Sequence, residues 1–182
     1  MSKTARFFMP VVSLFGANVL AELAEQVASL GGAKPLVVTD QGMTQLGYTK
    51  QVTDLLDQAE IAYAVFDQTV PNPTDTNVNE GAAAYTENQC DMLISLGGGS
   101  AHDCCKGVGL LVSNGGQIAD YEGVDMSKKA LPPYIAINTT AGTASELTRF
   151  TIITNTSNHV KMAIVDWRVT PDLAINDPLL MM

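Results

Sequence analysis

A glycine-rich loop and a hydroxyl-rich loop contain the residue types best suited to binding phosphate and ribose groups. The first, Gly97-Gly98-Gly99-Ser100, stands between an apolar run and the start of an expected helix. There, backbone N–H groups and the positive end of the helix dipole favour an anion, and glycines let a pyrophosphate approach the main chain. The alternative is a tight turn in which Ser100 caps the helix. Neither Gly-x-Gly-x-x-Gly nor the Walker lysine pattern occurs, so the loop alone does not identify the ligand.

The hydroxyl-rich loop spans residues 138–146 and directly follows another apolar run. Its four hydroxyl side chains are Thr139, Thr140, Thr143 and Ser145. Such side chains can bind phosphate and ribose oxygens, but they are also ordinary capping material, so both interpretations stay open. Loops at the carboxyl ends of parallel strands face the crevice in which open α/β sheets bind ligands. We therefore expect the two loops to line one cleft.

Four titratable side chains could add to this chemistry. Asp40 ends a strand-like run, as does the carboxylate that binds the adenine ribose in dinucleotide enzymes, although that acid normally follows the glycine loop by about 20 residues. A surface-turn aspartate is the alternative.

Lys161 could meet a cofactor phosphate or ribose, or it could be a solvated hairpin lysine. His102 and Asp103 look like a catalytic pair, but neighbouring helical residues do not face each other, which favours a structural or cofactor-positioning role.

The elements that must position these loops alternate between helix and strand. The spacing of apolar residues predicts helices near residues 20–30, 52–59, 78–85 and 104–112. Short apolar runs predict buried strands at 35–39, 62–66, 92–96 and 134–137. Residues 150–154 and 160–165 flank a turn-forming segment and predict a β-hairpin near the C-terminus. The expected fold is α/β: a Rossmann-like, mostly parallel sheet with helices on both faces, in a single domain over residues 1–182.

Composition narrows the class of protein. The chain has 182 residues, of which 46% are hydrophobic, so it can bury a core and is not generally disordered. A formal net charge of -9 argues against nucleic-acid and anionic-membrane partners. Cys90, Cys104 and Cys105 form no disulfide framework, which favours a reducing compartment. We expect a soluble cytoplasmic protein, because residues 1–10 lack a signal-peptide core and no later run is long enough to span a membrane.

Several long motifs resemble those of the iron-containing (group III) alcohol dehydrogenases, in particular the bacterial ethanol dehydrogenase branch. They are Pro71-Asn72-Pro73-Thr74, the segments 95–104, 120–125 and 137–146, His159-Val160-Lys161-Met162-Ala163-Ile164-Val165-Asp166, and Asn176-Asp177-Pro178-Leu179. They occur in order and cover essentially the whole chain. The resemblance implies the NAD-binding half of an enzyme that moves a hydride between a primary alcohol or aldehyde and NAD(H).

The resemblance also implies roles for individual residues. Gly98, Gly99 and Ser100 would bind the pyrophosphate, Asp40 the adenine ribose, and Asn72 would lie beside the adenosine. The residues expected to line the remainder of the cofactor are Thr139, Thr140, Thr143, Ser145, Thr148, Phe150 and Lys161. A carboxylate at Asp40 would favour NAD over NADP. None of these residues is expected to be catalytic.

The family's helical domain, which binds iron or zinc, is expected to be absent from this chain. Only two histidines, His102 and His159, are present, too few for the multi-histidine site of a metal alcohol dehydrogenase. The chain alone is therefore expected to be inactive, and the full-length enzyme to be a homo-oligomer. The alternative is a non-catalytic nucleotide-binding or assembly module, suggested by the end of the chain on the apolar run 179–182. The 138–146 motif argues against a sister enzyme such as glycerol dehydrogenase.

Overall fold

The structure is a computed structural model that describes residues 12–181. Residues 1–11, which include the segment where we expected no signal peptide, and residue 182 lie outside the described residues. Within the described part, no helix is both long enough and apolar enough to cross a membrane.

Six strands form one sheet in which every neighbouring pair is parallel. Their order across the sheet is β1 (Val12–Phe15), β9 (Leu173–Asn176), β6 (Tyr134–Asn138), β4 (Met92–Gly97), β2 (Pro35–Val38) and β3 (Ala64–Phe66). The chain moves outward from β2 to β3 and then returns to the other side of β2 to form β4. This reversal creates a topological switch point between β2 and β4, where α/β sheets of this kind bind ligands.

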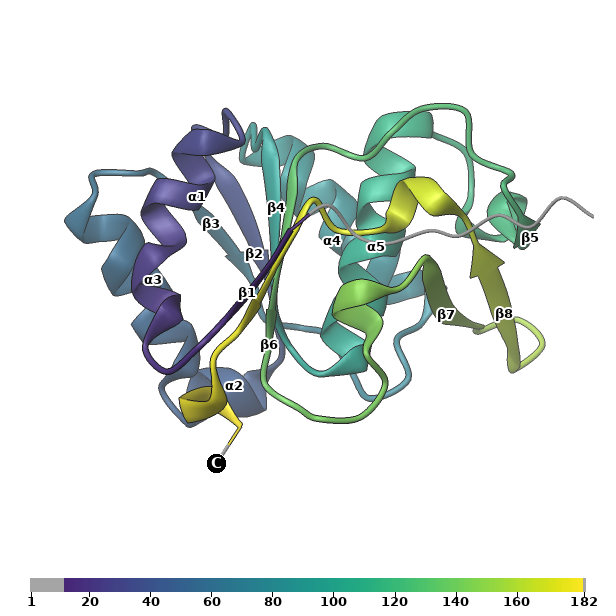
Figure 1. The fold of residues 1–182 in the computed structure, drawn as a ribbon. Helices are drawn as coiled ribbons and strands as arrows, with labels where there is room; N and C mark the ends of the chain where they lie inside the picture. The colour runs from purple at the N-terminus through teal and green to yellow at the C-terminus, as the bar shows by residue number, and fades with distance from the viewer. Residues whose placement is uncertain (1–11, 182) are drawn as a thin grey trace, which may run out of the picture.

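Helices cover both faces of the sheet, as Figure 1 shows. The α-helices are α1 (Leu23–Ser29), α2 (Gln41–Gln45), α3 (Tyr48–Gln58), α4 (Asp75–Glu87) and α5 (Gly99–Asn114). The short 3-10 helices are η1 (Val19–Glu22), η2 (Ile118–Tyr121), η3 (Ser145–Leu147), η4 (Trp167–Val169) and η5 (Pro178–Leu180). Helices α1 and α3 pack on one face, and α4 and α5 pack on the other. The predicted Rossmann-like fold is thus confirmed.

Successive residues of one strand contribute to two separate cores. Val37 packs in the core that contains Leu23 of α1 and Leu56 of α3. Its neighbour Leu36 packs in the core that contains Val108 of α5. All five side chains are fully buried. Because both faces of the strand are covered, apolar residues are needed at every position, and the sequence of β2 shows no alternation of polar and apolar residues.

A second, three-stranded sheet lies beside α5 and includes the predicted hairpin. Strands β7 (Phe150–Asn155) and β8 (Val160–Val165) pair antiparallel, and the short β5 (Gly123–Val124) pairs with β8 in parallel. The Thr151 hydroxyl donates a hydrogen bond of 2.7 Å to the backbone oxygen of Asp103, which joins the hairpin to α5. The hairpin is therefore attached to the helix that begins at the glycine loop.

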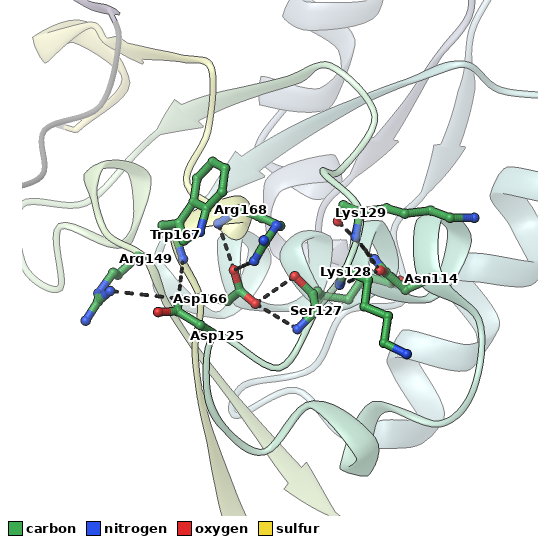
Figure 2. A network of polar contacts seen from close by, with 10 residues as sticks. Asn114, Asp125, Ser127, Lys128, Lys129, Arg149, Asp166, Trp167 and Arg168 are labelled. Atoms are coloured by element: carbon green, nitrogen blue, oxygen red, sulfur yellow. Dashed lines mark hydrogen bonds and ion pairs between the residues drawn. The ribbon is translucent and has the colours of Figure 1, made fainter.

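A polar network stabilises the end of β8 (Figure 2). One carboxylate oxygen of the buried Asp166 accepts hydrogen bonds from the backbone nitrogen and the hydroxyl of Ser127, at 2.9 and 2.6 Å. The other oxygen accepts from the backbone nitrogen of Arg168 at 3.0 Å. The Arg168 guanidinium lies 4.5 Å from the centre of the Trp167 ring. The network joins the loop after β5 to the end of β8, and it contains none of the residues predicted to bind a cofactor.

The structure differs from the sequence prediction at several boundaries. Strands β1, β9 and β5 and the helix α2 were not predicted, and the segment 62–66 is a strand only from Ala64. The helix expected over 20–30 begins as the 3-10 helix η1 and ends at Ser29. Strands β1 and β9 pair with each other, Val12 beside Leu173, so their existence depends on contacts between distant parts of the chain.

Gly81 of α4 and Gly107 of α5 allow these two helices to pack closely, and replacing Gly107 should destabilise the fold. A Cβ added at Gly107 would lie 2.7 Å from Cγ2 of Val78. We expect Gly107→Ala to lower the free energy of unfolding by about 1 kcal/mol or more, because the overlap outweighs the gain in helix propensity. Urea unfolding would measure the change. Gly16→Ala is the control, since a Cβ there meets nothing within 4 Å; equal effects of the two variants would contradict the packing explanation.

Candidate functional site

A cleft of about 750 Å³ lies at the carboxyl edge of the parallel sheet, at the switch point. Its walls are the segments that follow β2 (40–43), β3 (67–71), β4 (98–101) and β6 (139–140). The glycine-rich and hydroxyl-rich loops therefore line the same cleft, as the sequence predicts. A cavity of this size is in the usual range for a small-molecule site.

The glycine loop leaves the first turn of α5 open toward this cleft. Gly97 has a φ of +143°, which a side chain would disfavour, and Gly98 is the N-cap residue of α5. The alternative that Ser100 caps this helix is wrong, because Ser100 lies inside the first turn. Of the side chains that the structure describes, none caps α5 by a hydrogen bond. Backbone N–H groups of the first turn are thus free of a capping side chain, which suits an anion.

The hydroxyl loop packs directly onto the two glycines that begin α5. A Cβ added at Gly98 would lie 2.9 Å from Oγ1 of Thr140, and one added at Gly99 would lie 2.8 Å from Oγ1 of Thr143. The backbone nitrogen of Thr139 donates to the oxygen of Gly97 at 3.0 Å. Any side chain at Gly98 or Gly99 would push the second loop away. The glycines are therefore required by the contact between the loops as well as by the open helix start.

Asp40 has two contacts in this cleft. Its Oδ1 accepts a hydrogen bond of 3.0 Å from the backbone nitrogen of Met43 and so caps α2. Its Oδ2 lies 3.7 Å from the position that a Cβ would take at Gly97. The side chain is half-buried and lines the cleft. One carboxylate oxygen thus stabilises a helix while the other lies next to the glycine loop.

Lys161 and Asn72 connect the hairpin to the other side of the site. The Lys161 ammonium donates a hydrogen bond of 2.7 Å to Oδ1 of Asn72, and the backbone nitrogen of Asn72 donates to the Ser100 hydroxyl at 3.3 Å. Asn72 has a φ of +55°, a left-handed conformation that asparagine tolerates better than most residues. Three residues predicted from distant parts of the chain therefore meet through hydrogen bonds.

His102 and Asp103 do not form a catalytic pair. His102 is fully buried, and its Nδ1 lies 2.7 Å from the Ser95 hydroxyl, which also lies 2.7 Å from the Tyr134 hydroxyl. Burial, with a smaller contribution from the charge of Lys106, lowers the pKa of His102 to about 3, so the ring is neutral at physiological pH. Asp103 instead accepts hydrogen bonds from the Ser145 hydroxyl in the hydroxyl loop and from the backbone nitrogen of Ile152 in β7. These contacts are compatible with the structural or cofactor-positioning role that the sequence favours.

Lys106 is the important residue of this region that sequence reasoning missed. It is fully buried, and its ammonium donates to the backbone oxygens of Ser145, Thr148 and Phe150 at 2.7, 2.9 and 2.7 Å. It also lies 3.0 Å from the Ser145 hydroxyl. The sequence did contain one signal, a lysine among small and apolar residues on the buried side of a helix. A buried charge needs hydrogen-bonding partners, so this position indicated that Lys106 binds another part of the chain.

The predicted cofactor residues fall into two groups. The walls of the 750 Å³ cleft include Asp40, Gly98, Gly99, Ser100, Thr139 and Thr140. The residues outside those walls are Asn72, Thr143, Ser145, Thr148, Phe150 and Lys161. The Ser145 hydroxyl is almost fully buried between Lys106 and Asp103, so it is engaged within the protein. Among residues 12–181, no three His, Cys, Asp or Glu side chains gather in a way that could hold a metal ion.

A parallel sheet with a glycine loop and a hydroxyl loop at its switch point defines a Rossmann-like α/β domain. The chain belongs to the iron-containing alcohol dehydrogenase family, whose model, described as "Iron-containing alcohol dehydrogenase", matches residues 10–178. The resemblance seen in the sequence motifs is thereby confirmed.

Relatives in this family are similar along nearly the whole chain. Alcohol dehydrogenase 4 of Schizosaccharomyces pombe is 51% identical over 172 residues, which are 94% of this chain and 41% of that protein. A crystal structure of 1,3-propanediol oxidoreductase matches with a TM-score of 0.95 at 44% identity, covering 98% of this chain and 47% of that one. Sulfoacetaldehyde reductase from Bifidobacterium kashiwanohense, solved in complex with NAD+, matches with a TM-score of 0.86 at 31% identity, covering 99% and 48%. The chain spans about half the length of these relatives.

Proposed function

We propose that residues 1–182 form the NAD-binding domain of a metal-dependent alcohol dehydrogenase. The observation that carries this proposal is the open start of α5 at the switch point, where Gly98 and Gly99 pack against Thr140 and Thr143. Only a loop without side chains lets an anionic group and the hydroxyl loop both approach the helix start. A family relative solved with NAD+ supports a dinucleotide as the ligand.

In this proposal each wall of the site has a separate task. Backbone N–H groups at Gly99 and Ser100 bind the pyrophosphate, and the free oxygen of Asp40 accepts hydrogen bonds from the adenine ribose. Asn72 lies beside the adenosine, and Thr139, Thr140 and Thr143 border the central part of the cofactor. Thr148, Phe150 and Lys161 lie on the side of the nicotinamide and its ribose. When bound, the nicotinamide ring exchanges a hydride with the substrate carbon.

The remainder of the enzyme lies, in this proposal, in a helical domain that holds iron or zinc. The metal would act there as a Lewis acid on an alcohol or aldehyde oxygen. Substrates are small primary alcohols and aldehydes, as the names of the family relatives suggest. We place the protein in the reducing cytoplasm as a homo-oligomer, with its three cysteines free.

Titration of the 182-residue chain with NADH, followed by fluorescence or calorimetry, tests the binding site. We expect saturable binding that weakens at least about tenfold in Ser100→Asp, because the added carboxylate would lie in the turn that binds the pyrophosphate. Ser100 is a better choice than Gly98 or Gly99, since a side chain at either glycine would also displace the hydroxyl loop. An acidic residue in a first helical turn does not by itself harm folding.

Gln51→Glu is the matched control, because it adds the same charge to the exposed first turn of α3. Its NADH affinity should equal that of the wild type. If the wild-type chain fails to bind NADH, or if both variants bind it as the wild type does, the assignment of the glycine loop to the pyrophosphate is wrong.

A further inference from the structure

We propose that Lys106, acting with Asp103, is a positioning residue that holds the segment 145–152 against α5 and thereby fixes the nicotinamide side of the cleft relative to the pyrophosphate side. The inference rests on the proposed function, because it assigns the two sides of the site to two parts of one cofactor. It concerns a side chain that does not line the cleft and that acts through hydrogen bonds to the backbone of a neighbouring segment.

The contacts of Lys106 are directed at one turn of the chain. Its ammonium has three N–H donors, and three backbone oxygens, those of Ser145, Thr148 and Phe150, lie within 2.9 Å of it. These oxygens lie in η3, at its C-cap residue and at the start of β7, which are 39 to 44 positions further along the chain. A single buried charge therefore determines how this turn approaches α5.

Asp103 binds the same segment from one turn earlier on α5. Its Oδ1 accepts a hydrogen bond of 2.7 Å from the Ser145 hydroxyl, and its Oδ2 accepts one of 3.2 Å from the backbone nitrogen of Ile152. The Thr151 hydroxyl adds the bond to the backbone oxygen of Asp103. Ser145, at one end of the segment, is thus bound to both Lys106 and Asp103, and Ile152, at the other end, is bound to Asp103.

The same helix begins at the glycine loop. Lys106 lies six positions after Ser100, a distance of about 9 Å along an α-helix. A rigid helix therefore connects the N–H groups proposed for the pyrophosphate with the turn that presents Thr148 and Phe150. Ala144, directly before the turn, has a φ of +52°, an unfavourable conformation for alanine that persists only where its surroundings impose it.

A residue that served only to pack the core would not need the charge of Lys106. Methionine could fill a similar volume without the cost of burying an ammonium group. Burial lowers the pKa of Lys106 to about 8, and the titratable groups that act against this lowering are Asp103, Glu146 and Cys105. At pH 7 the ammonium is charged and makes its bonds to the turn, whereas at pH 9 it is mostly neutral and has one donor fewer. His102, next to Asp103, stays neutral over this range.

The test compares two ligands that fill different parts of the site, NADH and ADP. In Lys106→Met we expect NADH to bind about tenfold more weakly while the affinity for ADP changes by less than about twofold, because small displacements of a binding element are costly. Lys106→Arg keeps a charged donor and should recover part of the NADH affinity. Lys128→Met, at an exposed position outside the cleft, is the control and should leave both affinities unchanged.

A measurement on the wild type covers the case in which Lys106→Met does not fold. The ratio of NADH to ADP affinity should fall between pH 7 and pH 9, and in Lys106→Arg it should stay constant. A parallel loss of both affinities in Lys106→Met, or a ratio independent of pH in the wild type, would overturn this proposal and leave the proposed function standing. A wild-type chain that binds neither ligand would overturn both.

Discussion

Lowering the pH from 7 to 4 should cost the folded chain about 3 kcal/mol through His102 alone. The imidazole is fully buried, and burial holds its pKa near 3 in the folded state, whereas an exposed histidine titrates near 6.5. Between these values the unfolded chain binds a proton that the folded chain excludes. The stabilisation is therefore complete above pH 6.5 and is lost as the pH falls toward 3. Because domains are stable by only about 5–15 kcal/mol, this loss is large.

Urea unfolding of His102→Asn at pH 7, 5.5 and 4 would isolate the contribution. The asparagine amide can still reach the Ser95 hydroxyl but does not titrate, so most of the decrease below pH 6.5 should disappear. Burial raises the pKa of Asp103 and Asp172, which acts in the opposite direction but equally in both proteins.

The second histidine of the chain supplies a matched control. His159 is exposed and has a φ of +57°, a conformation that suits asparagine, so His159→Asn should fold normally. The free energy of unfolding of His159→Asn should depend on pH in the same way as that of the wild type. A profile for His102→Asn that also follows the wild type would show that the histidine gains a proton in the folded state without cost.

The central strands and both polar loops could be predicted because their signals are local. Leu36 and Val37 face opposite cores, and a strand covered on both sides is apolar at each position. The run before Gly97 has the same pattern, so the strand, the glycines and the helix after them follow in one segment. The cleft was predictable from a general rule, since parallel strands bring their carboxyl ends to one edge of the sheet.

The missed features depend on contacts between distant residues. Strand β9 has four residues and completes the sheet only because Leu173 lies between Val12 and Ile135. The role of Lys106 was not predicted for a similar reason. Its partners, Ser145 and Phe150, lie in a segment whose position against α5 no local pattern reveals. Ser145 belongs to the same segment. Its hydroxyl, expected from the sequence to line the cofactor, is instead hydrogen-bonded to Lys106 and Asp103.

Asp40→Asn should make the chain much less selective between NADH and NADPH. The 2′-phosphate of NADPH would bring about two negative charges toward the carboxylate. At an effective dielectric constant of about 20, like charges some 4 Å apart repel by on the order of 4 kcal/mol for each pair, before salt and relaxation reduce the effect. The wild type should therefore prefer NADH strongly, and the amide should reduce the ratio of the two affinities by at least about tenfold. Competition titrations with both nucleotides would measure the ratio.

Asparagine is preferable to glycine for this test because Asp40 also caps α2 through Oδ1. Asparagine is as good an N-cap as aspartate, whereas Asp40→Gly removes the cap and the hydrogen bonds to the ribose together. Asp67→Asn is the matched control, since Asp67 also lines the cleft but follows β3. If Asp40 binds the ribose hydroxyls, Asp67→Asn should leave the preference for NADH over NADPH nearly unchanged, whereas Asp40→Asn should reduce it. Equal shifts in the two variants would mean that the general negative charge of the cleft, and not this carboxylate, selects the cofactor.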